Sequence, residues 1–265
     1  MISVRLVLAL VALHDWKLWQ PDVKNAFLYG ELDKDIYMEQ PSGYVSNSHP
    51  NYVCKLKKAL YELKQAPRAW YGKISQYLQF GGYQASDSDL SLFVKKQGSL
   101  HLVVLLYVHD MIITGNYEME VDKLQDESAI IFDIKKLGEL HHFLGLEVTN
   151  LASGIFLSQE SYAKKLVERF GVNQSKRCST PLEVNKKLRR EEGSLLANPQ
   201  PYRTLVGSLL YLTIIRPDIS FSVGLVSRFM KSPRKPHLEA AKKILKYVNS
   251  TLDMGLLFKK KLPLL

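Results

Sequence analysis

The feature that most constrains this fold is a pair of short apolar runs that lie close together in the sequence. Residues 101–107 read His-Leu-Val-Val-Leu-Leu-Tyr, and residues 111–114 read Met-Ile-Ile-Thr. A short, nearly continuous apolar run is typical of a strand that is covered on both faces, because a half-exposed strand would alternate. The two runs therefore predict a tight, buried hairpin with Tyr107 to Met111 at its tip.

The segments on either side of this hairpin alternate between helical and extended patterns. Pro67 is placed to begin a helix, and Gly81 with Gly82 to end it. Further helices are expected at 2–13 and 119–131, and a turn or short helix at 24–30. Strands are expected at 18–23, 36–39, 53–57, 92–95, 143–148 and 155–157.

Beyond residue 149 the pattern becomes mainly helical, with helices expected at 162–170, 202–215, 219–230 and 237–248 and a long loop over 173–200. Residues 151–265 hold 21 Lys and Arg against 8 Asp and Glu, whereas residues 1–150 hold 15 against 18. The sequence thus predicts a near-neutral α+β domain over 1–148 and a basic helical domain over 149–265. Such asymmetry suggests a polyanionic partner, although a solvated surface would give the same counts.

Composition excludes several classes of protein. The 265 residues are 46% hydrophobic and 23% charged, which is ordinary for a folded chain. No apolar run is long enough for a transmembrane helix. Two cysteines cannot form a disulfide framework or a four-cysteine zinc site, so an intracellular setting, in cytoplasm or nucleus, is expected. The apolar N-terminus lacks a signal-peptide cleavage site and reads instead as a helix buried all round.

Two aspartates are the first candidates for chemistry. Asp22 ends the strand expected at 18–23, and Asp110 lies in the hairpin tip, 88 residues later. Carboxylates at neighbouring strand ends can share divalent metal ions, as phosphoryl transfer with two metals requires. Their spacing alone, however, also fits two ordinary turn aspartates.

The sequence segments around these two aspartates resemble the motifs of a known protein family. Residues 22–28, Asp-Val-Lys-Asn-Ala-Phe-Leu, resemble the first catalytic motif of copia-type retrotransposon reverse transcriptases. Residues 60–71 resemble the next conserved block, and residues 107–115 match the Tyr-x-Asp-Asp block except at one position. Further similar segments, in the family's order, are 142–148 (primer grip) and 202–212 with 216–219 (the approach to RNase H).

The resemblance implies a right-hand polymerase. Residues 1–148 would form the palm, an antiparallel sheet backed by helices, and 149–265 a basic, mainly helical thumb or connection region. The fingers are expected to be largely absent and the RNase H domain missing, so that the chain is a truncated segment. Its partners would be an RNA or DNA template–primer and deoxynucleoside triphosphates, with no membrane; its oligomeric state is left open.

The resemblance also implies roles for individual residues. Asp22 and Asp110 would bind two Mg²⁺ ions. Phe27 falls at the steric-gate position, or is simply a core aromatic. Gln65 and Arg68 would line the nucleotide and template site, or are surface residues at a helix N-terminus. Nucleic-acid contacts in the basic region are expected from Lys164, Lys165, Lys242 and Lys243.

Three positions depart from the family pattern. His109 replaces an aspartate, and imidazole suits Zn, Cu or Ni, whereas Mg²⁺ prefers carboxylate and water. A new transition-metal site at His109 is the alternative. Pro21 is awkward in a central strand and is expected to move Asp22 out of line. Glu62 stands where the family usually has glycine, which puts a tight backbone approach in doubt.

We therefore expect a catalytically inactive copy of this polymerase. The alternatives are a working RNA-directed DNA polymerase and a non-catalytic nucleic-acid-binding remnant that uses residues 151–265. A fourth is a fragment that does not fold stably because palm surface is left uncovered.

Overall fold

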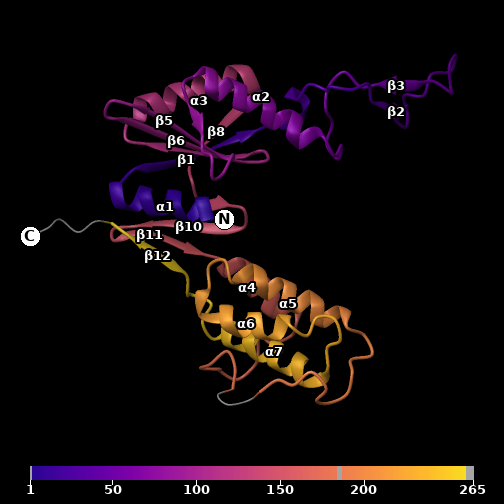
Figure 1. Ribbon diagram of the computed structural model, residues 1–265, viewed down its shortest axis with the longest axis vertical. Coiled ribbons are helices and arrows are strands. Elements are labelled where there is room, and N and C mark those ends of the chain that lie inside the picture. The colour runs from indigo at the N-terminus through magenta and orange to yellow at the C-terminus, as the bar shows by residue number, and fades with distance from the viewer. Residues whose placement is uncertain (1, 184–186, 261–265) are drawn as a thin grey trace, which may run out of the picture. The chain divides into compact units, whose positions relative to one another are not determined.

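A computed structural model describes residues 2–183 and 187–260 (Figure 1). The chain divides into two compact units, an N-terminal unit from Ile2 to Leu140 and a C-terminal unit from His141 onward. The change in composition near residue 149 falls inside the second of these units. Within the described part of the chain, no helix combines the length and the apolar character that crossing a membrane requires.

The N-terminal unit is built on a six-stranded antiparallel sheet in the order β4-β5-β6-β7-β1-β8. Helices α2 and α3 cover one face of this sheet and α1 lies on the other (Figure 1). The strands are β1 (Lys17–Val23), β4 (Gln84–Ala85), β5 (Leu92–Gln97), β6 (Leu100–Tyr107), β7 (Asp110–Gly115) and β8 (Ile134–Glu139). The helices are α1 (Ile2–His14), η1 (Ala26–Tyr29), α2 (Ala66–Phe80) and α3 (Glu118–Phe132).

The predicted hairpin is β6 and β7, and both of its faces are buried. On one face Val104 and Ile113 join a core with Trp70 of α2 and Phe132 of α3. On the other face Leu105 is also almost fully buried. Each such side chain contributes roughly 1.5–3 kcal/mol on removal from water. The prediction that this hairpin is covered on both faces is therefore confirmed.

The first helix corrects one expectation. Residues 2–14 are helical and bury Val7, Leu8 and Val11. Ile2 and Leu6 remain exposed, so the helix is not buried all round as its composition predicted. An apolar composition raises the tendency to be buried, but a helix is covered only where another layer lies.

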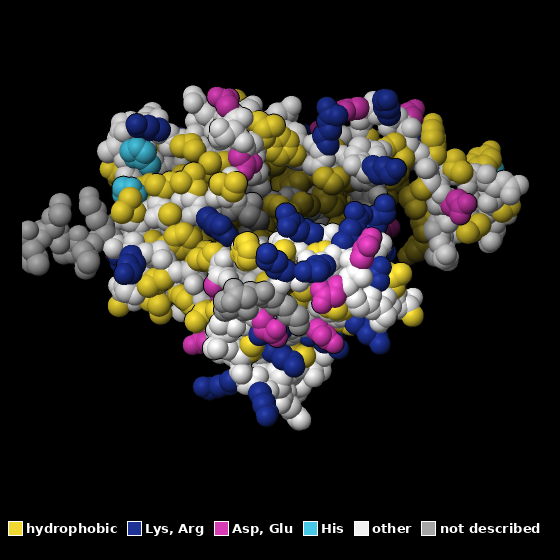
Figure 2. Space-filling view, turned by 60° about the horizontal axis from the view of Figure 1, so that its bottom comes forward, with side chains coloured by type: hydrophobic (Ala, Val, Ile, Leu, Met, Phe, Trp, Pro, Cys, Tyr) yellow, Lys and Arg dark blue, Asp and Glu magenta, His cyan; other side chains and the backbone are white. Residues whose placement is uncertain are grey.

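A separate two-stranded ribbon extends from the N-terminal unit (Figure 1). It consists of β2 (Tyr37–Glu39) and β3 (Val53–Lys55), and neither strand has a buried residue. Tyr44 and Tyr52 in its loop are also largely exposed, and apolar side chains are plain on this ribbon in Figure 2. An isolated two-stranded ribbon has little intrinsic stability.

The C-terminal unit combines a four-stranded antiparallel sheet, in the order β12-β11-β10-β9, with a helical layer. A core that includes Leu166, Leu205, Val223 and Ile244 lies among the helices. The strands are β9 (His142–Phe143), β10 (Leu146–Leu151), β11 (Gly154–Ser158) and β12 (Leu256–Lys259). The helices are α4 (Glu160–Arg169), α5 (Gln200–Leu212), η2 (Pro217–Ile219), α6 (Ser220–Ser227) and α7 (Lys235–Asn249).

The α+β class with antiparallel sheets is thus confirmed, but several strands were not predicted. Strand β8 has the sequence Ile-Lys-Lys-Leu-Gly-Glu and buries only Ile134. Strand β12 pairs with β11, which lies about a hundred residues earlier in the chain. The strand expected at 143–148 is interrupted at Leu144 and Gly145, which both have positive φ. Pairing with a distant strand, and not a local pattern, holds β8 and β12 in place.

Candidate active site

Four side chains form a row across the sheet of the N-terminal unit. Tyr107 of β6 is opposite Asp110 of β7. Asp110 is opposite Asp22 of β1, and Asp22 is opposite Lys135 of β8. Directly opposed residues of antiparallel strands point to the same face. The row lies on the face away from α2 and α3, because the neighbouring Val23 points into their core.

The row brings together the two candidate carboxylates. Asp22 and Asp110 are Cα partners on adjacent strands, although 88 residues separate them in the chain. The side chain of Asp110 is 29% exposed, and Asp22 is partly buried. Two half-buried carboxylates side by side, open to solvent on one face, are able to bind a cation together.

Pro21 does not displace Asp22, contrary to expectation. The pairing of β1 with β7 keeps one register from Lys17 opposite Gly115 to Asp22 opposite Asp110. The irregularity that a proline imposes lies on the other side, between Trp19 and Pro21 in the pairing with β8. A local bulge against the edge strand therefore absorbs the missing N–H donor.

His109 occupies the turn of the hairpin together with Val108. Its side chain is half exposed, and its Nε2 lies 4.0 Å from Oδ2 of Asp110. Within the described residues, no three His, Cys, Asp or Glu side chains converge as a metal-binding group. The row offers two carboxylates and, beside them, an imidazole. This set does not match the all-oxygen ligands that two Mg²⁺ ions prefer.

Phe27 and His109 line one cavity of about 540 Å³. Phe27 is 9% exposed and belongs to the core of the unit, yet its ring also forms part of the cavity wall. The ring of Tyr61 lies 5.4 Å from it, centroid to centroid. Asn25 precedes η1 with φ of +51°, a conformation that asparagine tolerates well, and so sets the position of Phe27.

Gln65 and Arg68 do not line this cavity. Both are exposed at the start of α2, where Gln65 is the N-cap residue and makes no capping bond with its side chain. They line a second, polar cavity of about 380 Å³ together with Glu31, Asp33 and Lys34. The structure thus separates these two residues from Phe27 and His109.

The four lysines expected to contact nucleic acid differ in their local pairing. Lys164 pairs with Glu160 at 2.6 Å, which raises the pKa of that lysine through a hydrogen bond and the opposite charge. Lys243 pairs with Glu183 at 3.5 Å. Lys165 and Lys242 are exposed and have no ion pair among the described residues.

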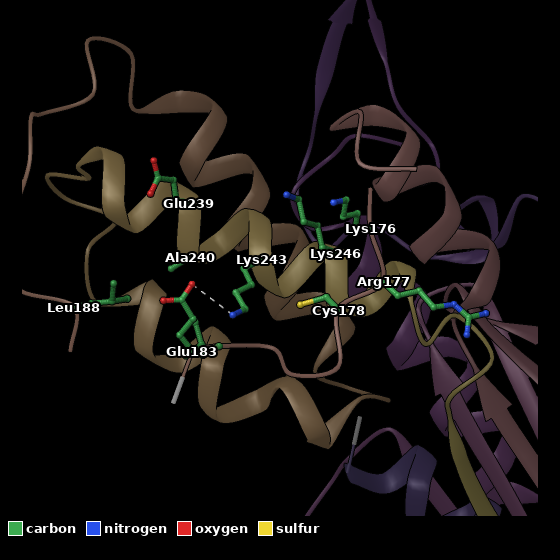
Figure 3. A pocket seen from close by; sticks show the side chains of 10 residues that line it. Lys176, Arg177, Cys178, Glu183, Leu188, Glu239, Ala240, Lys243 and Lys246 are labelled. Carbon is green, nitrogen blue, oxygen red and sulfur yellow. Dashed lines mark ion pairs between the residues drawn. The ribbon is translucent and has the colours of Figure 1, made fainter. Parts of the chain in front are cut away.

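A further basic cavity of about 360 Å³ lies beside α7 (Figure 3). Its wall includes Lys176, Lys243 and Lys246, with Glu183 among them. In Figure 3 the ammonium ends of Lys176 and Lys246 lie near each other, while Lys243 turns towards Glu183. Lys246 was not among the residues predicted from the sequence, although its spacing of four residues from Lys242 indicates a shared helix face.

Lys135 was also missed from the sequence. It lies opposite Asp22 and adds a cation to the row of carboxylates. No local signal could have assigned it this place, because the strand that carries it was not predicted. Only the pairing of β8 with β1 shows that this exposed lysine is next to Asp22.

Comparison with known proteins gives a consistent result. The family model described as "Reverse transcriptase (RNA-dependent DNA polymerase)" matches residues 1–184. The chain is 44% identical over 258 residues to the retrovirus-related Pol polyprotein from transposon RE1 of Arabidopsis thaliana, a match that covers 97% of this chain and 18% of that protein. It is 40% identical to the corresponding protein from transposon TNT 1-94 of Nicotiana tabacum, over 97% of this chain and 20% of that protein. The chain therefore spans about a fifth of the length of these relatives.

Proposed function

The chain belongs to the reverse transcriptase family, as a segment of a copia-type retrotransposon Pol polyprotein, and we propose on this premise that its first 148 residues form the polymerase palm. In this proposal the row of Asp110 and Asp22 occupies the place of the centre at which the family joins a deoxynucleoside triphosphate to a primer. Phe27, on the wall of the adjoining cavity, contacts the sugar of the incoming nucleotide. Gln65 and Arg68 contact the template or nucleotide from the start of α2. Residues 149–265 act as the thumb.

One observation carries the proposal. Asp22 and Asp110 come from separate segments and meet as direct partners in the sheet. Two carboxylates in this relation can together hold a divalent ion beside a reacting phosphate. Lys135, next in the row, supplies a positive charge towards the polyphosphate of the same substrate.

We further propose that this copy does not catalyse extension, because His109 stands where a third carboxylate belongs. A unit charge about 4 Å from a dication contributes roughly 8 kcal/mol at an effective dielectric of about 20, before desolvation. Each ~1.4 kcal/mol of transition-state stabilisation is a factor of ten in rate. Even partial loss of this attraction lowers the rate by orders of magnitude.

Primer extension on a defined RNA template, with Mg²⁺ and then with Mn²⁺, tests both statements. The natural chain is compared with His109→Asp and with His109→Asn, after circular dichroism has shown that all three are folded. We expect no extension by the natural chain or by His109→Asn. His109→Asp should extend the primer at least about a hundredfold faster than the natural chain.

Extension by the natural chain at the rate of His109→Asp would contradict the proposed inactivity. Two negative results together would show that the assignment of the row as a catalytic centre is wrong: none of the folded chains extends a primer, and His109→Asp binds Mn²⁺ no better than His109→Asn.

The second candidate function is non-catalytic binding of nucleic acid by residues 151–265. The observation that favours it is the excess of cations there, 21 Lys and Arg against 8 Asp and Glu, of which Lys165 and Lys242 lie exposed on helices α4 and α7. Such a surface would bind phosphates with little preference for sequence.

A further inference from the structure

We propose that Trp70 is a positioning residue, whose indole holds the hairpin turn in the conformation that presents His109 and Asp110. The hydrogen bond between Trp70 and the turn is independent of any activity. Its importance for catalysis rests on the function proposed above for the row of Asp22 and Asp110.

The turn contains a residue in a disfavoured conformation. Val108 has φ of +57°, in the left-handed region that a β-branched side chain rarely adopts. Such a conformation is unfavourable for a residue with a side chain and persists only where the surrounding structure imposes it. The side chain of Val108 is 43% exposed, so packing of its own methyl groups does not account for the conformation.

A two-residue hairpin turn, which the pairing of Tyr107 with Asp110 closes, requires positive φ at its first residue, and a hydrogen bond from α2 holds this turn in place. The indole Nε1–H of Trp70 donates a hydrogen bond of 2.7 Å to the backbone carbonyl oxygen of Val108. Trp70 is only 2% exposed, so its indole N–H has little access to water once this hydrogen bond is broken. A buried donor left without an acceptor is costly, and this couples the orientation of the Val108 carbonyl to the position of the ring.

The ring in turn is fixed by the core. The rings of Phe132 and Trp70 meet edge to face, with centroids 5.4 Å apart. Tyr29 contacts Trp70 from another side at 6.1 Å. A Cβ on Gly30 would come within 2.9 Å of the backbone nitrogen of Trp70, so this stretch of α2 sits directly against the chain after η1. Packing therefore holds the indole ring of Trp70 in a fixed position within the core.

The turn has direct consequences for the candidate site. His109 follows Val108, and Asp110 is the next residue, opposite both Tyr107 and Asp22. If Val108 relaxed to negative φ, the two side chains that follow would be re-aimed. A Trp70 that served only as a core aromatic would stabilise the whole unit without a special effect on this turn.

Amide hydrogen exchange of the full chain distinguishes these roles. Trp70→Phe keeps an aromatic ring but removes the donor. We expect it to raise the exchange rates of the amides of Tyr107 and Asp110, the pair that closes the turn, by roughly three- to tenfold, as one hydrogen bond of ordinary net value allows. These rates are taken relative to Leu102 and Gly115 at the far end of the same hairpin.

The matched control is Phe93→Leu, which removes a fully buried ring of β5 and leaves both the indole donor and its ring neighbours Tyr29 and Phe132 in place. It should raise exchange at both ends of the hairpin alike. A uniform rise in Trp70→Phe as well would overturn the positioning role and leave Trp70 a core residue.

A rescue experiment tests the part played by strain. Glycine adopts positive φ without steric cost. We therefore expect Val108→Gly, combined with Trp70→Phe, to restore slow exchange at the turn. If the double variant exchanges as fast as Trp70→Phe alone, strain at Val108 is not what the indole opposes.

Activity supplies a separate readout in the His109→Asp background. There, Trp70→Phe should lower kcat for extension by roughly three- to tenfold with a smaller change in KM for the nucleotide. If His109→Asp neither extends a primer nor binds Mn²⁺ better than His109→Asn while the exchange result holds, the proposed function fails and the positioning role stands. If His109→Asp extends and Trp70→Phe changes neither turn exchange nor kcat, the positioning role is wrong.

Discussion

At the scale of single residues, Glu62 shows why the family resemblance points to glycine at this position. Its φ is +72°, in the left-handed region where a side chain is disfavoured. The expectation was that a side chain here puts a tight backbone approach in doubt. The structure gives a different reason, since the backbone conformation itself is the one that favours glycine.

Replacing Glu62 by glycine should therefore stabilise the protein. The relief of backbone strain is worth about 1–2 kcal/mol, less the greater freedom that glycine gives the unfolded chain. We expect a net gain of about 0.5–1 kcal/mol, measured by urea denaturation. Lys64→Gly is the control, because Lys64 has no positive φ and should lose up to about 1 kcal/mol. A loss in Glu62→Gly equal to that in Lys64→Gly would show that Glu62 is not strained.

At the scale of elements, the position of α2 depends on one glycine outside the helix. A Cβ on Gly30 would lie 2.8 Å from Cβ of Ala69 and 2.9 Å from the nitrogen of Trp70. Inside α2, by contrast, a Cβ on Gly72 would meet nothing within 4 Å. The sequence alone does not distinguish these two glycines, because only their surroundings in the folded protein differ.

Gly30→Ala and Gly72→Ala should consequently have opposite effects. Gly30→Ala forces α2 away from η1, and we expect a loss of about 1–3 kcal/mol, as in overpacked cores. Gly72→Ala improves helix propensity and should gain about 0.5–1 kcal/mol. Thermal and urea unfolding of the two variants give the comparison. Equal effects in the same direction would rule out close packing at Gly30.

The joint between α5 and α6 is fixed by an ion pair between the buried Arg216 and the partly exposed Asp218. Arg216 is 4% exposed and donates to both carboxylate oxygens of Asp218, at 2.9 and 2.7 Å. It also donates to the backbone oxygen of Thr251, at 2.8 Å. Burial acts to raise the pKa of Asp218, but the hydrogen bonds and charge of Arg216 outweigh it and hold the pKa below its ordinary value.

This pair predicts a stability that depends on pH. A carboxyl with a lowered folded pKa contributes its stability above its unfolded pKa of about 3.9 and loses it as the pH falls through the folded value. Asp218→Asn should cost about 1.5–3 kcal/mol at pH 7, and the difference from the natural chain should shrink below about pH 4.

Urea unfolding from pH 7 to pH 3 gives the two curves. Asp87→Asn, at an exposed position, serves as the control and should differ from the natural chain by less than about 0.5 kcal/mol. A gap for Asp218→Asn that stays constant down to pH 3 would contradict the role of its charge.

At the scale of the whole molecule, the charge is unequally divided along the chain. The basic excess belongs to residues 151–265, and the structure sorts the lysines there by their partners. Lys164 and Lys243 have acidic neighbours within 4 Å, whereas Lys165 and Lys242 have none among the described residues. Cations that are already paired have less to gain from a phosphate.

Binding of the full chain to an RNA–DNA duplex should therefore depend steeply on salt and on the second pair of lysines. Lys165→Glu with Lys242→Glu should weaken binding more than Lys164→Glu with Lys243→Glu. It should also reduce the slope of log K against log salt by up to about 0.9 for each phosphate that the protein no longer neutralises.

Fluorescence anisotropy over a series of salt concentrations measures both quantities. Lys96→Glu, an exposed position in the N-terminal unit, is the control for general loss of charge. If Lys96→Glu weakens binding as much as the change at Lys165 and Lys242, the basic region is not the binding surface.

The sequence by itself determined what depends on neighbouring residues. Local sequence patterns predicted helix α2, the buried hairpin of β6 and β7, and the basic helices of the C-terminal unit. Each of these features depends on the order of residues that are close together in the chain. Membership of a polymerase family could also be predicted from the sequence, since segments that resemble the family's motifs follow one another in the family's order. The same motifs identified His109, which replaces an aspartate, as the departure from the family pattern with the largest chemical consequence.

Only the tertiary structure decided which residues meet. It placed Asp22 opposite Asp110 despite Pro21, and it put Lys135 beside Asp22. It also joined Trp70 to the turn at Val108. Each of these interactions joins segments tens of residues apart, and a local pattern specifies a strand or helix but neither its partner nor its register. The chemistry of the row is therefore a property of the assembled sheet.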